Sequence, residues 1–574
     1  MSIMQKIMET VVQFVPDKDP DPMMHKHGYI GKPLSRVDGP LKVKGEAAFT
    51  AEFKVENPAH AALVYSTIAK GKITAIDVTE AEKANGVLTI ITHENAPKMN
   101  DPAVADLSGG SRGAAASDLP ILRDEQIYRD GQPIAVVVCE TQDQAEHAAS
   151  LVKVAYETQR AAVSFDALKP EAFAPPNVLG EPPEVNIGHA EEQLKDAAFK
   201  IDHIYRTPRY NQNAIEPHAT VAAWNDDTGL MVFESTQNLY AVRNTLAKMF
   251  DLAPEKVRVV APFVGGGFGG KGMMWDNTAL CAAAAKVAKR PVVLALSRAG
   301  VFRAVGGRTV SEQRVALGAS EDGKFVALIH SGTTATTAHN DFPEQFTFPA
   351  RHLYAAENIF VSQKVVHLDM VANSAMRAPG EAPGSFALES AIDELACAMK
   401  IDPIELRRIN EPAKDPTKGT EFSSRNLTEA YRRGAEKFNW KNAEPRTQRE
   451  GSWQIGQGVA TAYYPAYRFP ASARVRISQD GTAVVSASAH EMGMGTATVQ
   501  IQHAAQRLGL PLDKVSFEYG DTDLPESPQA GGSNQTISVV ASVAAAIEKA
   551  HREILALAGD DYDSPLSNLK YEHI

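Results

Sequence analysis

The stretch VVAPFVGGGFGGKGMMWDN, residues 259–277, places five glycines within six positions, between a β-branched run and an alanine-rich segment. This order predicts a strand, a tight glycine loop and a helix that runs from about Asp276 to Arg290. Because glycine has no Cβ, consecutive glycines allow backbone N–H groups to approach a ligand closely. The positive end of the following helix favours an anion, so the segment predicts a strand–loop–helix unit that holds an anionic ligand.

The glycine loop matches two nucleotide-binding patterns, and each match fails at the residue that carries its chemistry. Residues 265–270 fit G-x-G-x-x-G, but a dinucleotide-binding turn also needs an acidic residue about 20 positions later. No Asp or Glu occurs between Asp276 and Glu312. Residues 265–271 fit G-x-x-x-x-G-K, but that loop needs Ser or Thr next, and position 272 is glycine. The loop therefore predicts some other large anion.

The chain is acidic, with 58 Lys and Arg against 70 Asp and Glu among 574 residues, and 44% of it is hydrophobic. This composition is typical of a globular protein of several domains, and it argues against a nucleic-acid or anionic-membrane surface. No run approaches the roughly 18 apolar residues of a membrane span, and no secretory or twin-arginine signal is present. We expect a cytoplasmic protein, or a periplasmic one exported with a signal-bearing partner.

Three cysteines, Cys139, Cys281 and Cys397, are widely spaced and lie in apolar contexts. We expect all three to be buried as small hydrophobic residues, without a disulfide framework. An iron–sulfur site with four cysteine ligands is excluded within this chain.

The pattern of linkers divides the chain into four regions. A proline-rich stretch at 169–185 predicts an extended linker, and the polar residues 413–450 predict another. The expected regions are an N-terminal extension at 1–29, a first domain at 30–160, a second at 186–412 and a third at 450–574.

The third domain contains two further glycine loops. GTAVVSASAHEMGMGTATVQI, residues 481–501, repeats the order of strand, glycine turn and helix, and PQAGGSNQT, residues 528–536, precedes another helix. Glycine loops at 265–270, 493–495 and 531–532 favour one extended anionic ligand held from several sides. The final residues, LKYEHI, predict the middle of a strand.

Several segments together resemble the molybdenum-binding large subunit of the xanthine dehydrogenase/aldehyde oxidase family, of the bacterial aldehyde oxidoreductase type. They follow in family order and spacing: GKPLSRVDGPLKVKGEAAFTAEF, EPHATVAAWNDDTGLMVFESTQN, VGGGFGGK, ANSAMRAPGEAPGSFALESAIDELA, DPIELRRIN, HEMGMGTATVQI and SPQAGGSNQT. The resemblance implies an α+β fold. A hammerhead-like N-terminal domain would precede two related molybdopterin-binding α/β lobes, the second of them incomplete.

The resemblance also implies cofactor-binding residues. Gln237 resembles the glutamine that bonds the molybdenum oxo ligand. The other matching positions are Gly267, Phe268 and Gly269 beside the metal, Ala375, Met376 and Arg377 at the pterin, and Gly493, Met494, Gly495, Gly532, Ser533, Gln535 and Thr536 at the pterin and its phosphates. Position 494 departs from several relatives, which have Gln where Met offers only its backbone.

The implied cofactor is molybdopterin with molybdenum, in the cytosine dinucleotide form. Its dithiolene sulfurs hold the metal, so no direct protein ligand is expected. The resemblance places a 2Fe–2S centre and FAD on partner subunits. A zinc protease motif at His490 and Glu491 fails, because H-E-x-x-H requires His at 494. His490 is therefore expected to be a packing residue.

Purine-oxidising relatives have a Glu after the loop lysine, whereas this chain has Gly272, which favours small aldehydes as substrates. Tyr463, Tyr464 and Arg468 in TAYYPAYRFP are candidates for the substrate pocket; the alternative is a surface aromatic loop. The family's catalytic base is a Glu in a G-x-G-E segment, which the resemblance places beyond residue 574. No catalytic residue is therefore expected within the chain, and a non-catalytic cofactor-binding fragment or scaffold is the alternative function.

Overall fold

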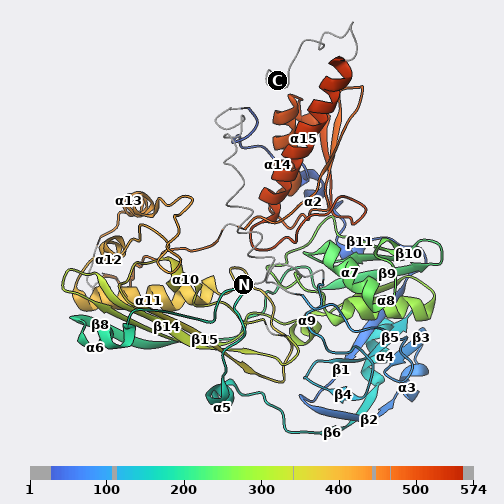
Figure 1. The fold of residues 1–574 in the computed structure, drawn as a ribbon. Coiled ribbons are helices and arrows are strands. Elements are labelled where there is room, and N and C mark those ends of the chain that lie inside the picture. The colour runs from blue at the N-terminus through green and yellow to red at the C-terminus, as the bar shows by residue number, and fades with distance from the viewer. Residues whose placement is uncertain (1–27, 106–112, 341, 442–447, 466, 560–574) are drawn as a thin grey trace.

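The computed structural model describes residues 28–105, 113–340, 342–441, 448–465 and 467–559 (Figure 1). Nearly all of the expected N-terminal extension, and the strand expected at LKYEHI, lie outside these residues. The described chain mixes helices and sheets, as the α+β prediction requires.

The largest sheet has seven strands in the order β11-β10-β9-β12-β1-β5-β3, and it combines strands of the first and second expected domains. β1 pairs in parallel with β12, with Ala59 opposite Val292, so the linker between the two domains does not divide the sheet. The strands are β1 (Ala59–Tyr65), β3 (Val87–Thr92), β5 (Pro133–Cys139), β9 (Ala219–Asn225), β10 (Gly229–Glu234), β11 (Val257–Val260) and β12 (Val292–Ala295). Every residue of β5 is buried, as its β-branched run predicts.

The helices α4 (Gln142–Leu151), α7 (Leu239–Met249) and α8 (Asp276–Ala288) cover this sheet (Figure 1). The predicted order of strand, glycine loop and helix is confirmed, because β11 leads through the loop into α8. Cys139 and Cys281 are buried as expected, but Cys397 is exposed. It lies in the last turn of α11 (Glu381–Met399), on a side of that helix that faces solvent. The prediction of burial from its apolar neighbours in sequence was therefore wrong.

A second sheet, with strand order β7-β15-β14-β13-β8, belongs to the second expected domain, except that β7 begins at Glu184, inside the stretch expected as a linker. Its strands are β7 (Glu184–Ile187), β8 (Phe199–Thr207), β13 (Ser311–Ala319), β14 (Phe325–Thr336) and β15 (Ile359–His367). The 19-residue helix α11 (Glu381–Met399) packs across β8 and β13, and α6 (Ala190–Asp196) packs against β13 and β14. Leu388, Ile392 and Leu395 of α11 are fully buried at helical spacing in the core of this layer.

The third lobe projects away from the other two layers (Figure 1). It has a three-stranded sheet of β18 (Arg474–Ile477), β19 (Ala483–Ser486) and β20 (Val515–Glu518), with helices α14 (Thr496–Leu508) and α15 (Gln535–Gly559). Val539, Val543 and Ile547, spaced four residues apart on α15, form its buried stripe. The N-terminal segment docks on this lobe, where Ile30 N donates to Gln506 Oε1 at 2.7 Å.

Short elements complete the described chain. The segments expected as linkers are partly ordered: residues 169–185 contain a short helix, and residues 413–450 contain the amphipathic helix α13. The remaining elements are α2 (Gly39–Val43), α3 (Thr79–Glu82), α5 (Phe165–Leu168), α9 (Arg298–Ala304), α10 (Phe348–His352), α12 (Pro403–Ile409), α13 (Leu427–Phe438), η1 (Thr50–Glu52), η2 (Lys169–Glu171), η3 (Pro254–Lys256), η4 (Leu512–Lys514), the sheet of β2 (Gly71–Asp77), β4 (Gln126–Ile127) and β6 (Lys153–Thr158), and the hairpin of β16 (Arg449–Glu450) and β17 (Trp453–Gln454).

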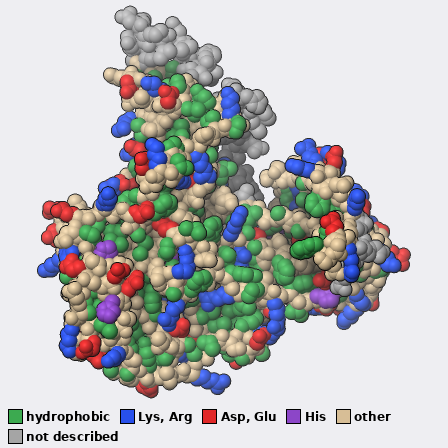
Figure 2. Space-filling model, turned by 180° about the vertical axis from the view of Figure 1, so that it is seen from behind, with side chains coloured by type: hydrophobic (Ala, Val, Ile, Leu, Met, Phe, Trp, Pro, Cys, Tyr) green, Lys and Arg blue, Asp and Glu red, His purple; other side chains and the backbone are tan. Residues whose placement is uncertain are grey.

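Basic and acidic side chains are interspersed over the face that Figure 2 shows, with hydrophobic side chains between them. Within the described ranges, no helix is both long and apolar enough to cross a membrane.

Candidate cofactor and substrate site

A cavity of about 590 Å³ lies where the predicted loops meet. Four predicted cofactor-binding residues, Gln237, Gly269, Ala375 and Gly532, line it together with Tyr463 and Tyr464. Its other lining residues are Leu179, Glu181, Gly272, Met273, Phe342, Gln345, Phe348, His352, Pro379, Glu381, Asp415, Lys418, Thr420, Phe422, Pro465, Tyr467, Phe469, Gln529 and Gly531. Seven of its 25 lining residues are Phe or Tyr, so aromatic side chains form a large part of its apolar wall, as in sites for flat organic ligands.

The side chain of Gln237 joins the first glycine loop to the third. Its Oε1 accepts from the backbone N–H groups of Gly269 at 3.0 Å and Lys271 at 3.3 Å. Its Nε2 donates to the carbonyl oxygen of Ala530 at 2.7 Å. A primary amide has two N–H groups, so one remains for a ligand in the cavity.

The first glycine loop needs its glycines for internal packing. A Cβ on Gly267 would overlap the Gln237 side chain, and a Cβ on Gly269 would overlap the carbonyl of Ala375. Phe268 between them has φ of 53°, a left-handed conformation that a bulky residue adopts only where the surroundings enforce it. These glycines are therefore required by the packing of the loop itself, in addition to any space that they leave for a ligand.

The loop of residues 375–378 is held by Arg308, which sequence analysis did not single out. Arg308 donates to the carbonyl oxygens of Met376 at 2.6 Å, Arg377 at 2.7 Å and Ala378 at 3.0 Å. Its Nε also donates to Glu344 at 2.7 Å. A lone arginine in a glycine-rich turn gives no sequence signal for this role, because every partner is distant in the chain.

The two loops also bond to each other, because the backbone N–H of Arg377 donates to the carbonyl oxygen of Phe268 at 2.9 Å. The predicted residues at 267–269 and 375–377 therefore form one continuous surface.

Lys271 is buried and forms an ion pair with Glu216 at 2.6 Å, so it is not a phosphate-binding lysine. Glu216 also accepts from the backbone N–H groups of Gly265 at 2.7 Å and Thr50 at 3.2 Å. The carboxylate of Glu216 thus accepts from the backbone N–H of Gly265, which was expected to be available to an anionic ligand.

The second glycine loop is built in the same way. Glu491 accepts from the backbone N–H groups of Gly493 at 2.6 Å, Gly495 at 3.3 Å and Thr496 at 2.7 Å at the start of α14. Arg36, from the N-terminal segment, donates to the carbonyl oxygen of Gly493 and lies 3.7 Å from Glu491. This arginine was also missed by sequence analysis, and it adds positive charge beside the loop.

The space beside this second loop is open. A Cβ on Gly493 would meet nothing within 4 Å, and one on Gly495 would meet only Arg36 at 3.8 Å. Met494 between them is exposed. The loop does not line the cavity, so the predicted cofactor residues form two groups.

The third glycine loop leads into the 25-residue helix α15, whose first-turn N–H groups have no partner within the helix. Gly532 and Ser533 both have positive φ, which turns the chain into that helix. Gln535 is buried and bonded to His490, whose Nδ1 lies 2.8 Å from its Nε2. Thr536 is half-buried, and its carbonyl oxygen accepts from Gln500. Burial lowers the pKa of His490 to about 3, which agrees with the expected packing role.

The aromatic segment that follows residue 460 is anchored at Thr461, inside the second layer. Thr461 N donates to Glu389 at 2.8 Å, and its hydroxyl lies 2.5 Å from that of Tyr354. Glu389 is itself paired with the fully buried Arg407 at 2.8 Å. The anchor fixes Tyr463, whose ring stacks on His352 with centroids 5.3 Å apart.

Arg468, predicted as a pocket residue, is exposed and is absent from the cavity wall. Its neighbours Tyr467 and Phe469 line the cavity instead, while Arg468 is exposed between them. Tyr463 and Tyr464 do line the cavity, and Tyr464 is also exposed to solvent.

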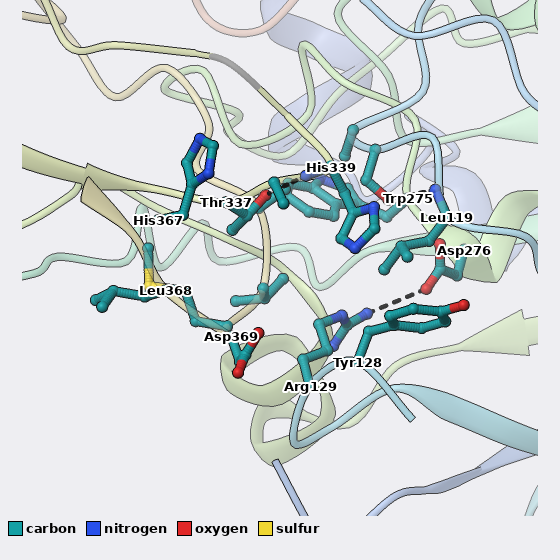
Figure 3. Close-up of a pocket in the computed structure, with 16 residues that line it drawn as sticks. Leu119, Tyr128, Arg129, Trp275, Asp276, Thr337, His339, His367, Leu368 and Asp369 are labelled. Atoms are coloured by element: carbon teal, nitrogen blue, oxygen red, sulfur yellow. Dashed lines mark hydrogen bonds and ion pairs between the residues drawn. The ribbon is translucent and has the colours of Figure 1, made fainter. Parts of the chain in front are cut away.

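A second, much smaller cavity of about 40 Å³ lies between the first domain and the second (Figure 3). Figure 3 shows Arg129 pointing toward Asp276, and their ion pair measures 3.1 Å. The space suits a few water molecules and not an organic ligand. Within the described residues, no group of three or more His, Cys, Asp and Glu side chains could hold a metal ion.

Comparison with known proteins matches every layer of this architecture. The aldehyde oxidase and xanthine dehydrogenase a/b hammerhead domain matches residues 44–160, and molybdopterin cofactor-binding domains match residues 171–411 and 433–573. The chain is 38% identical to PaoC, the aldehyde oxidoreductase molybdenum-binding subunit of Escherichia coli, covering 93% of this chain and 71% of PaoC. It is 29% identical to the putative xanthine dehydrogenase molybdenum-binding subunit XdhA of that organism, covering 91% and 72%.

Solved structures share the fold. Quinoline 2-oxidoreductase from Pseudomonas putida superposes with a TM-score of 0.82 at 22% identity, covering 95% of this chain and 73% of that one. The aldehyde oxidoreductase of Desulfovibrio desulfuricans gives 0.78 at 24% identity, covering 90% and 60%. Together with the sequence matches, this shows that the chain belongs to the xanthine dehydrogenase/aldehyde oxidase family, as the molybdopterin-binding subunit of a molybdenum-dependent oxidoreductase.

Proposed function

We propose that this subunit oxidises small aromatic aldehydes to carboxylic acids. The observation that carries the proposal is the cavity of about 590 Å³, which has aromatic walls and contains Gln237 and Gly269. Gly272 also lines it, so this position offers no carboxylate to bond a purine. The relative PaoC, 38% identical, is an aldehyde oxidoreductase subunit.

The site fits a cofactor that brings its own metal ligands. The described residues offer no metal-binding cluster, whereas the amide of Gln237, the open face of Gly495 and the start of α15 offer donors and space. We assign Gln237 and residues 267–269 to the metal end and residues 375–377 to the pterin. Residues 493–495 are assigned to the pterin and its phosphates, together with Gly532, Ser533, Gln535 and Thr536. The molybdenum cofactor supplies the redox chemistry, which removes two electrons from the substrate.

The protein's own contribution is binding and orientation. Tyr463 and Tyr464 flank the aromatic ring, and the anchor at Thr461 holds them in place before substrate arrives. Burial of an apolar ring in this cavity contributes roughly 25 cal/mol for each Å² removed from water.

We further assign the cofactor to the cytosine dinucleotide form, because the second and third loops extend beyond the cavity and Arg36 adds positive charge beside the second. Electrons would leave through partner subunits with a 2Fe–2S centre and FAD. The three cysteines of this chain are too few for an iron–sulfur site with four cysteine ligands, which supports placing that centre on a partner subunit. We place the assembly in the cytoplasm, or in the periplasm with an exported partner.

The test uses a chain that includes the expected G-x-G-E segment; it is loaded with cofactor, assembled with its partner subunits and compared on benzaldehyde and xanthine. We expect kcat/KM to favour benzaldehyde by about tenfold or more, because a buried polar group of the purine would lack a partner. Gly272→Glu should not improve aldehyde turnover, and Gly272→Gln is its control for added bulk. Equal specificity constants would contradict the proposal, and a loaded assembly without turnover would favour a non-catalytic scaffold.

A further inference from the structure

Two buried polar side chains on the wall of the large cavity have no partner for one of their oxygen atoms. Among the described residues, Glu381 Oε2 and Gln345 Oε1 are buried and make no hydrogen bond. The two residues are only 3% and 2% exposed, and both line the cavity. An unpaired buried polar atom is costly, so their shared position indicates that a ligand supplies the missing partner.

The two side chains are held in fixed positions relative to each other. Glu381 is the first residue of α11, and a Cβ on the preceding Gly380 would lie 2.5 Å from Gln345. Glu344, the neighbour of Gln345, accepts from Gly380 N at 3.0 Å and from Arg308 at 2.7 Å. The same arginine that holds the predicted pterin loop therefore also fixes this pair.

The neighbours of the pair are aromatic. Tyr464 and Tyr467 lie close enough for the Glu381 carboxyl to affect the pKa of both hydroxyls. The charge of Glu344 is offset by Arg308, with which it is paired. The pair thus places polar oxygens beside aromatic side chains of the cavity wall, suited to one polar substituent on a flat ring.

We propose that Glu381 and Gln345 form a subsite that binds a hydroxyl group on the ring of the aromatic aldehyde; this rests on the proposed function. A hydroxyl has one hydrogen and accepting lone pairs, so it can accept from the protonated carboxyl of Glu381 while it donates to the amide oxygen of Gln345; with an ionised Glu381 it donates to one of the two. Burial raises the pKa of Glu381 to about 7, so both states occur near neutral pH. A carboxylate substituent is disfavoured beside two glutamates.

The test compares 3- and 4-hydroxybenzaldehyde with the fluorobenzaldehydes of the same substitution, because fluorine has nearly the size of a hydroxyl but cannot donate. On the loaded assembly we expect kcat/KM to favour one hydroxy isomer over its fluoro partner by about tenfold. Glu381→Leu and Gln345→Met should each reduce that ratio toward one, and Glu381→Gln should retain part of it. Glu394→Leu, at an exposed position of the same helix, is the matched control and should keep the ratio.

A binding measurement separates this proposal from the proposed function. Calorimetry with hydroxybenzamides and fluorobenzamides, which cannot be oxidised as aldehydes are, should show the same preference in affinity and the same loss in Glu381→Leu. If no aldehyde is turned over but the preference for hydroxybenzamide holds, the subsite stands and the reaction is wrong. Equal binding of both benzamides, or a preference that survives Glu381→Leu and Gln345→Met, would overturn the subsite. So would tighter binding of an aminobenzamide than of the hydroxy compound.

Discussion

The side-chain nitrogen of Gln237 lies 2.7 Å from the carbonyl oxygen of Ala530, although 293 residues separate them in the chain. Its amide oxygen meanwhile accepts from Gly269 and Lys271. One amide therefore joins the first glycine loop to the third, and both loops line the cavity.

Replacing Gln237 with Leu should separate these loops. The buried N–H groups of Gly269 and Lys271 would lose their acceptor, which should lower the free energy of unfolding by about 1–3 kcal/mol and reduce bound molybdenum. Chemical denaturation and metal analysis measure the two effects. Gln193→Leu, at an exposed position of α6, is the control. Normal molybdenum content in Gln237→Leu would contradict the role of this residue.

Two glycines with nearly the same φ allow the loss of a cofactor contact to be separated from the backbone strain that any side chain would cause. Gly495, a predicted cofactor residue, has φ of 79°, and Gly481, in the turn between β18 and β19, has φ of 78°. A Cβ on Gly481 would meet nothing within 4 Å, and one on Gly495 would meet only Arg36. Valine should therefore strain both sites equally, while only Gly495→Val removes the cofactor. Equal molybdenum content in the two variants would refute the assignment of this loop.

The anchor of the aromatic segment gives a third prediction. Thr461→Val keeps the shape of the side chain but removes the hydroxyl that meets Tyr354 at 2.5 Å. The buried tyrosine would lose a partner, at a cost of about 1–2 kcal/mol in unfolding free energy, and Tyr463 and Tyr464 would lose their fixed position. We expect KM for aldehydes to rise more than kcat falls. Thr428→Val, on the exposed side of α13, should leave both constants unchanged.

The sequence was most informative where the signal is local. The glycine run with its flanking β-branched and alanine-rich segments predicted β11, the loop and α8, because each element depends on neighbours in the chain. The position of Gln237 beside that loop followed from the family resemblance. Its bond to Ala530 did not, because no pattern in either segment specifies the other.

The residues that were missed depend on distant partners. Arg308 acts through carbonyl groups of residues 376–378, and Glu381 gains its character from burial, so neither is visible in a linear pattern. The pairing of β1 with β12 likewise joins two expected domains through backbone bonds only. Arg468 was misassigned because an aromatic segment shows which residues are near a pocket, but only the three-dimensional structure shows which of them line it.

The last prediction concerns the pH dependence of stability through Glu381. Burial raises the pKa of this carboxyl to about 7, from an ordinary 4.5; the nearby Glu344 adds to the rise, and Arg308 and a hydrogen bond from Gln345 oppose it. Below pH 4.5 both the folded and the unfolded chain carry the proton. Between the two values only the folded chain keeps it, so stability falls as pH rises, and above pH 7 the full cost is present.

Glu381→Gln removes this titration while keeping the shape of the side chain. The variant should therefore gain stability over the parent as pH rises from 5 to 8, by up to roughly 3 kcal/mol. Denaturation at both pH values measures the difference. Glu389→Gln on the same helix is the opposite control. It removes one of the two carboxylates paired with the buried Arg407, leaving Asp393 at 2.7 Å, and should destabilise the protein at both pH values. A constant difference between Glu381→Gln and the parent across this range would mean that Glu381 does not change its protonation on folding.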